Sequence, residues 1–228
     1  ESGTPFSILT KGTLLRRDIP LLAESAQRVP VGLGVSMAIW ADELHDALEP
    51  GVPTPRARLD LVRALTDAGL PCGVFLAPVL PGLTDGKEHL DAALGAIAAA
   101  GATGVTVIPL HLRPGAREWF MAWLSTAHPE LTPRYEQLYA RRAYVPADYR
   151  TWLGQRVAPL LAAHGLDGQK GGAARKVDDR IATGVPGDEE VGFPAGSLPS
   201  GGLTGAALAA GPTGGPAESA AGEQLALL

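Results

Sequence analysis

The chain has 228 residues, of which 46% are hydrophobic and 19% charged, and its mean hydropathy is +0.10. These values indicate a globular protein that is long enough to bury one core. The net charge of −5 argues against a surface that holds nucleic acid by neutralising phosphates. No apolar run reaches about 18 residues, which excludes a membrane-spanning helix.

Two features concern the origin of the chain. No basic stretch precedes an apolar one at its start, so no signal peptide is expected, and a cytoplasmic location is favoured. The first residue is Glu1 rather than methionine, which suggests a fragment or a processed product. A single cysteine, Cys72, excludes an internal disulfide framework and a metal site made of cysteines alone.

Strand and helix patterns alternate along residues 1–166. Apolar, β-branched runs predict strands at 6–10, 31–38, 72–77 and 106–109. Amphipathic runs predict helices at 17–26, 54–68, 86–100, 114–125, 133–141 and 147–164. Thr54 is expected to cap the second helix, with Pro55 at its first position and Gly69 after its end. Asp85 is expected to cap the third.

Residues 167–228 have a different composition. They contain 14 Gly and 5 Pro among 62 residues, with 4 basic and 8 acidic side chains. Such a segment cannot bury enough apolar surface to offset chain entropy, so a disordered C-terminal tail is predicted.

The alternation in residues 1–166 predicts an α/β domain in which a parallel sheet is covered by helices. Four βα units are too few to close a (β/α)₈ barrel. They could form an open sheet or the later part of a larger curved sheet. In either case, functional residues should lie at the carboxyl ends of the strands.

The first two strand ends carry polar side chains. Lys11 follows the first strand, where it could direct a cation into a pocket or lie solvated on the surface. Ser36 ends the second strand, where its hydroxyl could bind a ligand or its own backbone. Gly32 and Gly34 lie inside that strand and not at a strand–helix turn, so a dinucleotide-binding fingerprint is poorly supported.

The other two strand ends are more apolar. The segment 77–85 (APVLPGLTD) is a stiff loop whose backbone could approach a flat ligand, although it could equally be a rigid turn. His111 and Arg113 alternate with leucines after the fourth strand and could face one side. The acidic residues of 42–49 are expected to form a solvated face. The aromatic segment 119–124 is expected in the core, and the histidines show no zinc-ligand spacing.

Four segments together resemble radical S-adenosylmethionine proteins, in particular the spore-photoproduct-lyase-like branch and its actinobacterial relatives. They are Thr-Lys after the first strand, Val-Ser-Met at the second, Leu-Glu-Pro before the helix at Thr54, and the 77–85 loop. The resemblance covers residues 4–166. It implies that these units are the last four of a partial (β/α)₆ barrel, with the cluster-binding part before Glu1.

The resemblance also implies a cofactor and its binding residues. In that family, three cysteines hold a [4Fe–4S] cluster that cleaves S-adenosylmethionine to a hydrogen-abstracting 5′-deoxyadenosyl radical. Lys11 resembles the lysine that reaches the cofactor carboxylate, although Gly12 stands where relatives often carry serine. Ser36 resembles the serine that contacts the ribose. The adenine would meet Val79, Leu80, Gly82 and the segment Leu110, His111 and Arg113.

These observations favour the C-terminal part of a radical S-adenosylmethionine enzyme, inactive without the cluster ligands that this chain lacks. The expected partner is the small-molecule cofactor; no membrane is expected, and nucleic acid is not favoured because no basic, aromatic-interleaved groove is present. The alternative is a non-catalytic remnant or interaction module. A third interpretation, an unrelated small α/β enzyme, lacks a recognisable catalytic group.

Overall fold

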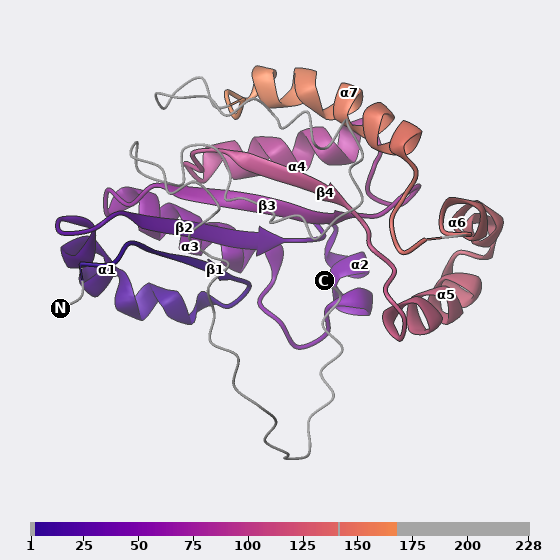
Figure 1. Cartoon of the computed structure of the whole chain (residues 1–228), viewed down its shortest axis with the longest axis horizontal. Coiled ribbons are helices and arrows are strands. Elements are labelled where there is room, and N and C mark those ends of the chain that lie inside the picture. Colours follow the sequence, from indigo (N-terminus) through magenta and orange to yellow (C-terminus); the bar gives the residue numbers. More distant parts are fainter. Residues whose placement is uncertain (1–2, 141, 168–228) are drawn as a thin grey trace, which may run out of the picture.

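The computed structural model describes residues 3–140 and 142–167. Within them, four strands form one parallel sheet in the order β1-β2-β3-β4 (Figure 1). The strands are β1 Phe6–Thr10, β2 Val31–Met37, β3 Cys72–Val79 and β4 Val105–Pro109. The helices are η1 Thr13–Asp18, α1 Ile19–Ala26, α2 Asp42–Leu48, α3 Pro55–Asp67, α4 Lys87–Ala99, α5 Ala116–Ala127, η2 Pro129–Leu131, α6 Thr132–Leu138 and α7 Ala147–Ala163. The predicted α/β class is confirmed.

The strand order decides between the two predicted architectures. Each strand pairs with the strand that follows it along the chain, without the reversal of a doubly wound sheet. Right-handed crossovers then place the connecting helices on one face of the sheet. This is the arrangement of consecutive units of a (β/α) barrel, so the four units form part of a curved sheet.

The core lies between the sheet and its connecting helices. Along β2, side chains alternate between the two faces. One set belongs to the main apolar cluster together with residues of α3 and α4; its members are Val31, Leu33, Val35 and Met37. The other set is small: Gly32, Gly34 and Ser36. Strand β2 therefore presents apolar side chains to the helices and small side chains to the opposite face of the sheet.

Helix α3 forms as the sequence predicts. Thr54 accepts a hydrogen bond on its side chain from the backbone N–H of Ala57, and Pro55 occupies the first helical position. Beyond the helix, Gly69 has a φ of +76°, which favours glycine. These three signals predict the position of α3 correctly because each depends only on residues close to it in the sequence.

Four local predictions were wrong in whole or in part. Helix α2 forms where no helix was predicted, and the helix predicted at 17–26 begins as the 3₁₀ helix η1 before continuing as α1. Helix α4 begins after Gly86 with no side-chain cap, so Asp85 does not cap it. In the aromatic segment Phe120 and Leu124 are fully buried, but Trp119 is 38% exposed. The predicted tail lies outside the described residues from residue 168 onward.

Helices α2, α5 and α6 lie at one end of the sheet. Figure 1 shows α2, α5 and α6 beyond the arrowheads of the strands, whereas α7 lies against α4 along the sheet. The three helices thus lie on the side of the sheet to which the carboxyl ends of the strands point. No helix in the described residues has the length and apolar character needed to cross a bilayer.

Candidate functional site

The ends of β1 and β2 bring Lys11 and Ser36 to the same place. Thr10 pairs with Val35 across the sheet, so the next residue on each strand, Lys11 and Ser36, occupies corresponding positions. Side chains at corresponding positions of paired strands share a face. The two candidates therefore lie at neighbouring strand ends.

A buried glutamate neutralises Lys11. The Nζ atom of Lys11 donates a hydrogen bond to Glu49 Oε1 at 3.0 Å, and the lysine side chain is 22% exposed. Glu49 itself is buried, with a side chain 6% exposed. The prediction that Glu49 belongs to a solvated face was wrong, since its buried side chain pairs with Lys11 at the strand end.

Arg58 of α3 completes this network. Its guanidinium donates to Glu49 Oε2 at 2.9 Å, to the carbonyl of Ser36 at 2.9 Å and to the carbonyl of Pro53 at 2.8 Å. The side chain is 1% exposed, so these three acceptors replace the water that it loses. We call Lys11, Glu49 and Arg58, with the Ser36 carbonyl, the strand-end ion network.

Two polar atoms beside the network have no partner among the described residues. They are Ser36 Oγ and His45 Nε2, and both are buried. His45 lies one helical turn before Glu49, with Nε2 3.9 Å from Glu49 Oε2, beyond hydrogen-bond range. A buried hydroxyl without a partner costs free energy, so Ser36 is suited to accept or donate a hydrogen bond to a ligand.

The loop after β3 is held in a fixed shape by its own residues. Leu80 donates its backbone N–H to Thr84 Oγ1 at 2.7 Å, and Thr84 donates its own N–H to the Leu80 carbonyl at 2.9 Å. Gly82 has a φ of +80°, and a Cβ there would lie 3.1 Å from Leu131. The side chains of Val79 and Leu80 belong to the apolar core. The loop is therefore rigid, and its apolar side chains are mostly turned inward.

Asp85 connects this loop to the last two helices. Tyr149 of α7 donates its hydroxyl proton to Asp85 Oδ2 at 2.9 Å, and Arg134 of α6 lies 3.7 Å from the same oxygen. Arg156 reaches the Asp85 carbonyl at 3.4 Å. Burial, followed by the charge and hydrogen bond of Asp85, raises the pKa of Tyr149, so this hydroxyl keeps its proton.

The backbone after β4 is already engaged. Leu110 donates its N–H to the Val79 carbonyl at 3.0 Å, and its carbonyl accepts from the Tyr139 hydroxyl at 2.8 Å. Leu112 donates to the Ala143 carbonyl at 2.8 Å. His111 is half-buried and packs edge-on against Tyr144, with ring centroids 4.4 Å apart, while Arg113 is exposed. The Leu110 carbonyl oxygen has a second lone pair, and an adenine amino group could donate a hydrogen bond only to that lone pair.

The residues that the structure describes do not form a metal centre. Cys72 is fully buried at the start of β3, and burial raises the pKa of its thiol to about 12. Residues 3–140 and 142–167 contain no group of three His, Cys, Asp or Glu residues that could hold a metal ion. Three thiolates are needed for a [4Fe–4S] cluster of the expected kind, and the sequence supplies one. The chain does not fit the cluster.

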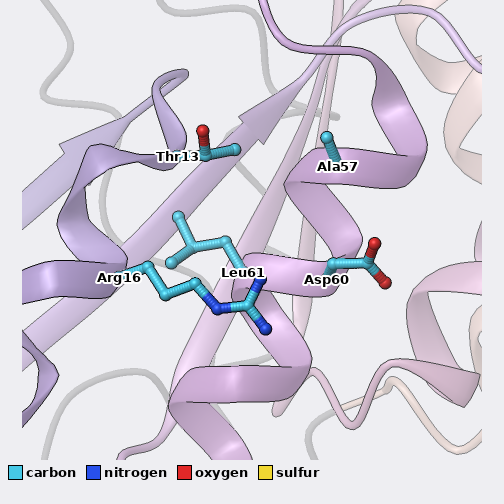
Figure 2. A pocket seen from close by; sticks show the side chains of 5 residues that line it. All are labelled: Thr13, Arg16, Ala57, Asp60 and Leu61. Carbon is cyan, nitrogen blue, oxygen red and sulfur yellow. The ribbon is translucent and has the colours of Figure 1, made fainter.

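A separate hollow lies between η1 and α3. Figure 2 shows the side chains that line it, which are Thr13, Arg16, Ala57, Asp60 and Leu61. Its volume of about 190 Å³ is below the range of about 300–1,000 Å³ that is usual for cofactor pockets. None of the candidate residues lines it, so it is distinct from the strand-end site.

The fold is a parallel α/β segment with polar groups at its strand ends, and a family model matches the part of the chain that carries the first of them. The model of the radical SAM superfamily matches residues 1–93. The resemblance predicted from the sequence is confirmed over these residues. The segment contains Lys11, Ser36, Glu49 and Arg58.

Similar proteins occur in bacteria and in a virus. Proteins of Mycobacterium bovis and Mycobacterium tuberculosis, both described as uncharacterized, are each 62% identical over 167 residues, which is 73% of this chain and 49% of theirs. A protein of Acidianus two-tailed virus is 34% identical over 115 residues, which is 49% of this chain and 38% of its own. The chain thus spans about half the length of the mycobacterial relatives.

Among solved structures, two of spore photoproduct lyase variants are similar. The TM-scores are 0.48 and 0.49, with sequence identities of 14% and 13%. Each match covers 69% of this chain and 48% of the lyase chain.

Proposed function

We propose that this chain supplies part of the S-adenosylmethionine-binding wall of a radical S-adenosylmethionine enzyme. The observation that carries the proposal is the buried Ser36 Oγ, which has no partner among the described residues and lies at the strand end next to Lys11. The match of residues 1–93 to the superfamily supports it. When bound, such a cofactor supplies a hydrogen-abstracting radical.

Lys11 is suited to hold the carboxylate of the cofactor. An ammonium group has three N–H donors, of which Glu49 accepts one. The strand-end ion network contains two cations and one carboxylate, so it carries one positive charge in excess. A ligand carboxylate beside Lys11 would neutralise that charge in a partly buried setting, where electrostatic attraction is stronger than in water.

Ser36 and the later strand ends would hold the adenosyl group. The Ser36 hydroxyl would bind the ribose hydroxyls, which would give it the partner that it lacks. The rigid loop with Val79, Leu80 and Gly82 and the segment Leu110, His111 and Arg113 would border the adenine. Because Val79 and Leu80 point into the core, their contribution would come from backbone and residual apolar surface.

Catalysis needs residues that this chain does not supply. With one cysteine in the sequence, the cluster ligands must come from residues outside it. The proposed role of the present residues is therefore to bind and orient the cofactor, and the substrate is not assigned.

Calorimetry with S-adenosylhomocysteine tests this role without the cluster. The full chain should bind the ligand, and Lys11→Ala and Ser36→Ala should each weaken binding about tenfold or more, the loss expected for one hydrogen bond to a charged or buried group. Glu24→Gln, which alters an exposed ion pair, is the matched control and should bind normally. Binding that is undetectable at about 1 mM ligand, or unchanged in both variants, would refute the proposal.

A second candidate, an interaction module, is favoured by one observation. Large apolar side chains are exposed on β1, η1 and α1; they are Phe6, Leu9, Leu14 and Leu21. In the described part of the chain β1 is also the terminal strand of the sheet, and strand edges with apolar neighbours favour association. Sedimentation velocity separates the candidates: association that is lost in Leu14→Glu, without binding of S-adenosylhomocysteine, would favour the module.

A further inference from the structure

Glu49 uses its two carboxylate oxygens for two different cations. Oε1 accepts from Lys11 at 3.0 Å, and Oε2 accepts from Arg58 at 2.9 Å. The three residues come from separate parts of the chain, namely the end of β1, the segment after α2, and α3. One carboxylate therefore joins three elements at the strand ends.

Arg58 gives this carboxylate a fixed position. Its other nitrogens bind the carbonyls of Ser36 and Pro53, so the guanidinium is attached to the end of β2 and to the segment before α3. With the side chain 1% exposed, it has no solvent to move into. Arg58 therefore fixes Glu49 and is itself fixed by the two carbonyls. Among the side chains of the network, only Lys11 reaches solvent.

We propose that Glu49 is a positioning residue that fixes the ammonium group of Lys11 where it meets the carboxylate of the ligand. This inference rests on the proposed function and adds a residue to it. A lysine side chain has four rotatable bonds and loses considerable entropy when it is held in one place. Glu49 removes most of that freedom before the ligand arrives, so binding costs less.

The opposite role for Glu49 predicts an opposite result. If the carboxylate merely masked the charge of Lys11, its removal would free the ammonium group and strengthen the binding of a ligand carboxylate. If it positions Lys11, its removal weakens that binding, because Lys11 is then repelled by the neighbouring Arg58 cation and loses its fixed place. The sign of the change in affinity distinguishes the two roles.

Two ligands separate an effect on Lys11 from an effect on the whole site. S-adenosylhomocysteine carries the amino-acid carboxylate, whereas 5′-methylthioadenosine keeps the adenosyl group and lacks that carboxylate. The measurement is calorimetry on the full chain and on the Glu49→Gln, Glu49→Asp and Lys11→Ala variants, with Glu24→Gln as an exposed control. We expect Glu49→Gln to weaken S-adenosylhomocysteine about tenfold and to leave 5′-methylthioadenosine within about twofold.

Glu49→Asp keeps the charge and shortens the side chain by one methylene, so it cannot span both cations. It should also weaken S-adenosylhomocysteine selectively, and it provides the test if Glu49→Gln does not fold. Combining either Glu49 variant with Lys11→Ala should add no further loss, because the two residues act through one contact. A tighter complex with S-adenosylhomocysteine, an equal loss for both ligands, or additive losses would overturn the proposal.

The proposed function and this inference fail in different ways. Absence of binding of both ligands to the unaltered chain refutes the binding wall and the positioning role together. Normal binding that depends on Lys11 and Ser36 but not on Glu49 keeps the binding wall and rejects the positioning role alone.

Discussion

The two halves of the strand-end region differ in how their polar groups are satisfied. At β1 and β2 the groups are charged, belong to side chains, and leave the Ser36 hydroxyl without a partner. At β3 and β4 they are mainly backbone groups, and two tyrosines donate to the region: Tyr139, which follows α6, to the Leu110 carbonyl, and Tyr149 of α7 to Asp85. The first half has an unpartnered hydroxyl beside charged side chains, whereas in the second half the backbone groups after β4 are paired and the unpartnered hydroxyl belongs to Tyr135 among aromatic side chains.

The largest effect on stability is expected when Arg58, which fixes the ion network at β1 and β2, is replaced. Arg58→Ala leaves Glu49 with Lys11 alone and deprives two backbone carbonyls of their donor. Breaking a buried ion pair in this way costs about 3–5 kcal/mol, which urea unfolding should detect. Arg63→Ala, which removes an exposed pair with Asp60, should cost at most about 1 kcal/mol. Equal losses would show that the network does not stabilise the fold.

The second half is tested by Tyr149→Phe. The variant removes the hydroxyl that donates to the buried Asp85 carboxylate and changes little else. A hydrogen bond to a charged group contributes about 1.5–3 kcal/mol, and urea unfolding should show a loss of that size. Tyr144→Phe is the matched control, because Tyr144 is 49% exposed, and its stability should change by no more than about 0.5 kcal/mol.

A smaller effect is expected at Gly82. With a φ of +80° and a Cβ position 3.1 Å from Leu131, Gly82→Ala introduces backbone strain and a close contact. The expected loss of stability is about 1–2 kcal/mol in thermal or urea unfolding. Gly86→Ala should be close to neutral, since a Cβ there meets no atom within 4 Å and its φ is −66°. Similar losses in both variants would contradict a rigid loop centred on Gly82.

The smallest effect concerns pH and His111. Burial, followed by the positive charge of Arg113, lowers the pKa of His111 below its usual 6.5. Below pH 6.5 the unfolded chain therefore binds more protons at this site than the folded chain does, and stability falls as the pH decreases from neutrality. His111→Gln should reduce this dependence in urea unfolding at pH 7.5 and about 5.5. A ring that titrates at or above 6.5 by NMR would contradict it.

Local signals in the sequence were sufficient for much of the fold. Strand β1 and helix α7 begin at the predicted residues, and Thr54, Pro55 and Gly69 delimit α3 as expected. These features depend on neighbours within one turn or one strand. Asp85 was placed wrongly because its local pattern resembles a helix cap, whereas a tyrosine 64 residues later binds it.

The site was predictable only in part for the same reason. Lys11 and Ser36 could be placed together because parallel strands end at one edge. Glu49 and Arg58 were missed, since charged residues in a helix or loop are usually solvated and nothing nearby in sequence shows that they bury each other. The Leu-Glu-Pro segment contributes to the family resemblance, and its glutamate is Glu49. This was the signal from which Glu49 could have been chosen as a site residue.

The bond from Tyr149 to Asp85 has a consequence for any shortened version of this domain. It places a donor for Asp85, the residue at the end of the β3 loop, in the final helix, 64 residues further along the chain. A truncation that removed α7 would leave this buried carboxylate without its tyrosine donor, even though the four strands were all retained. Any shortened version that keeps the donor therefore extends through α7.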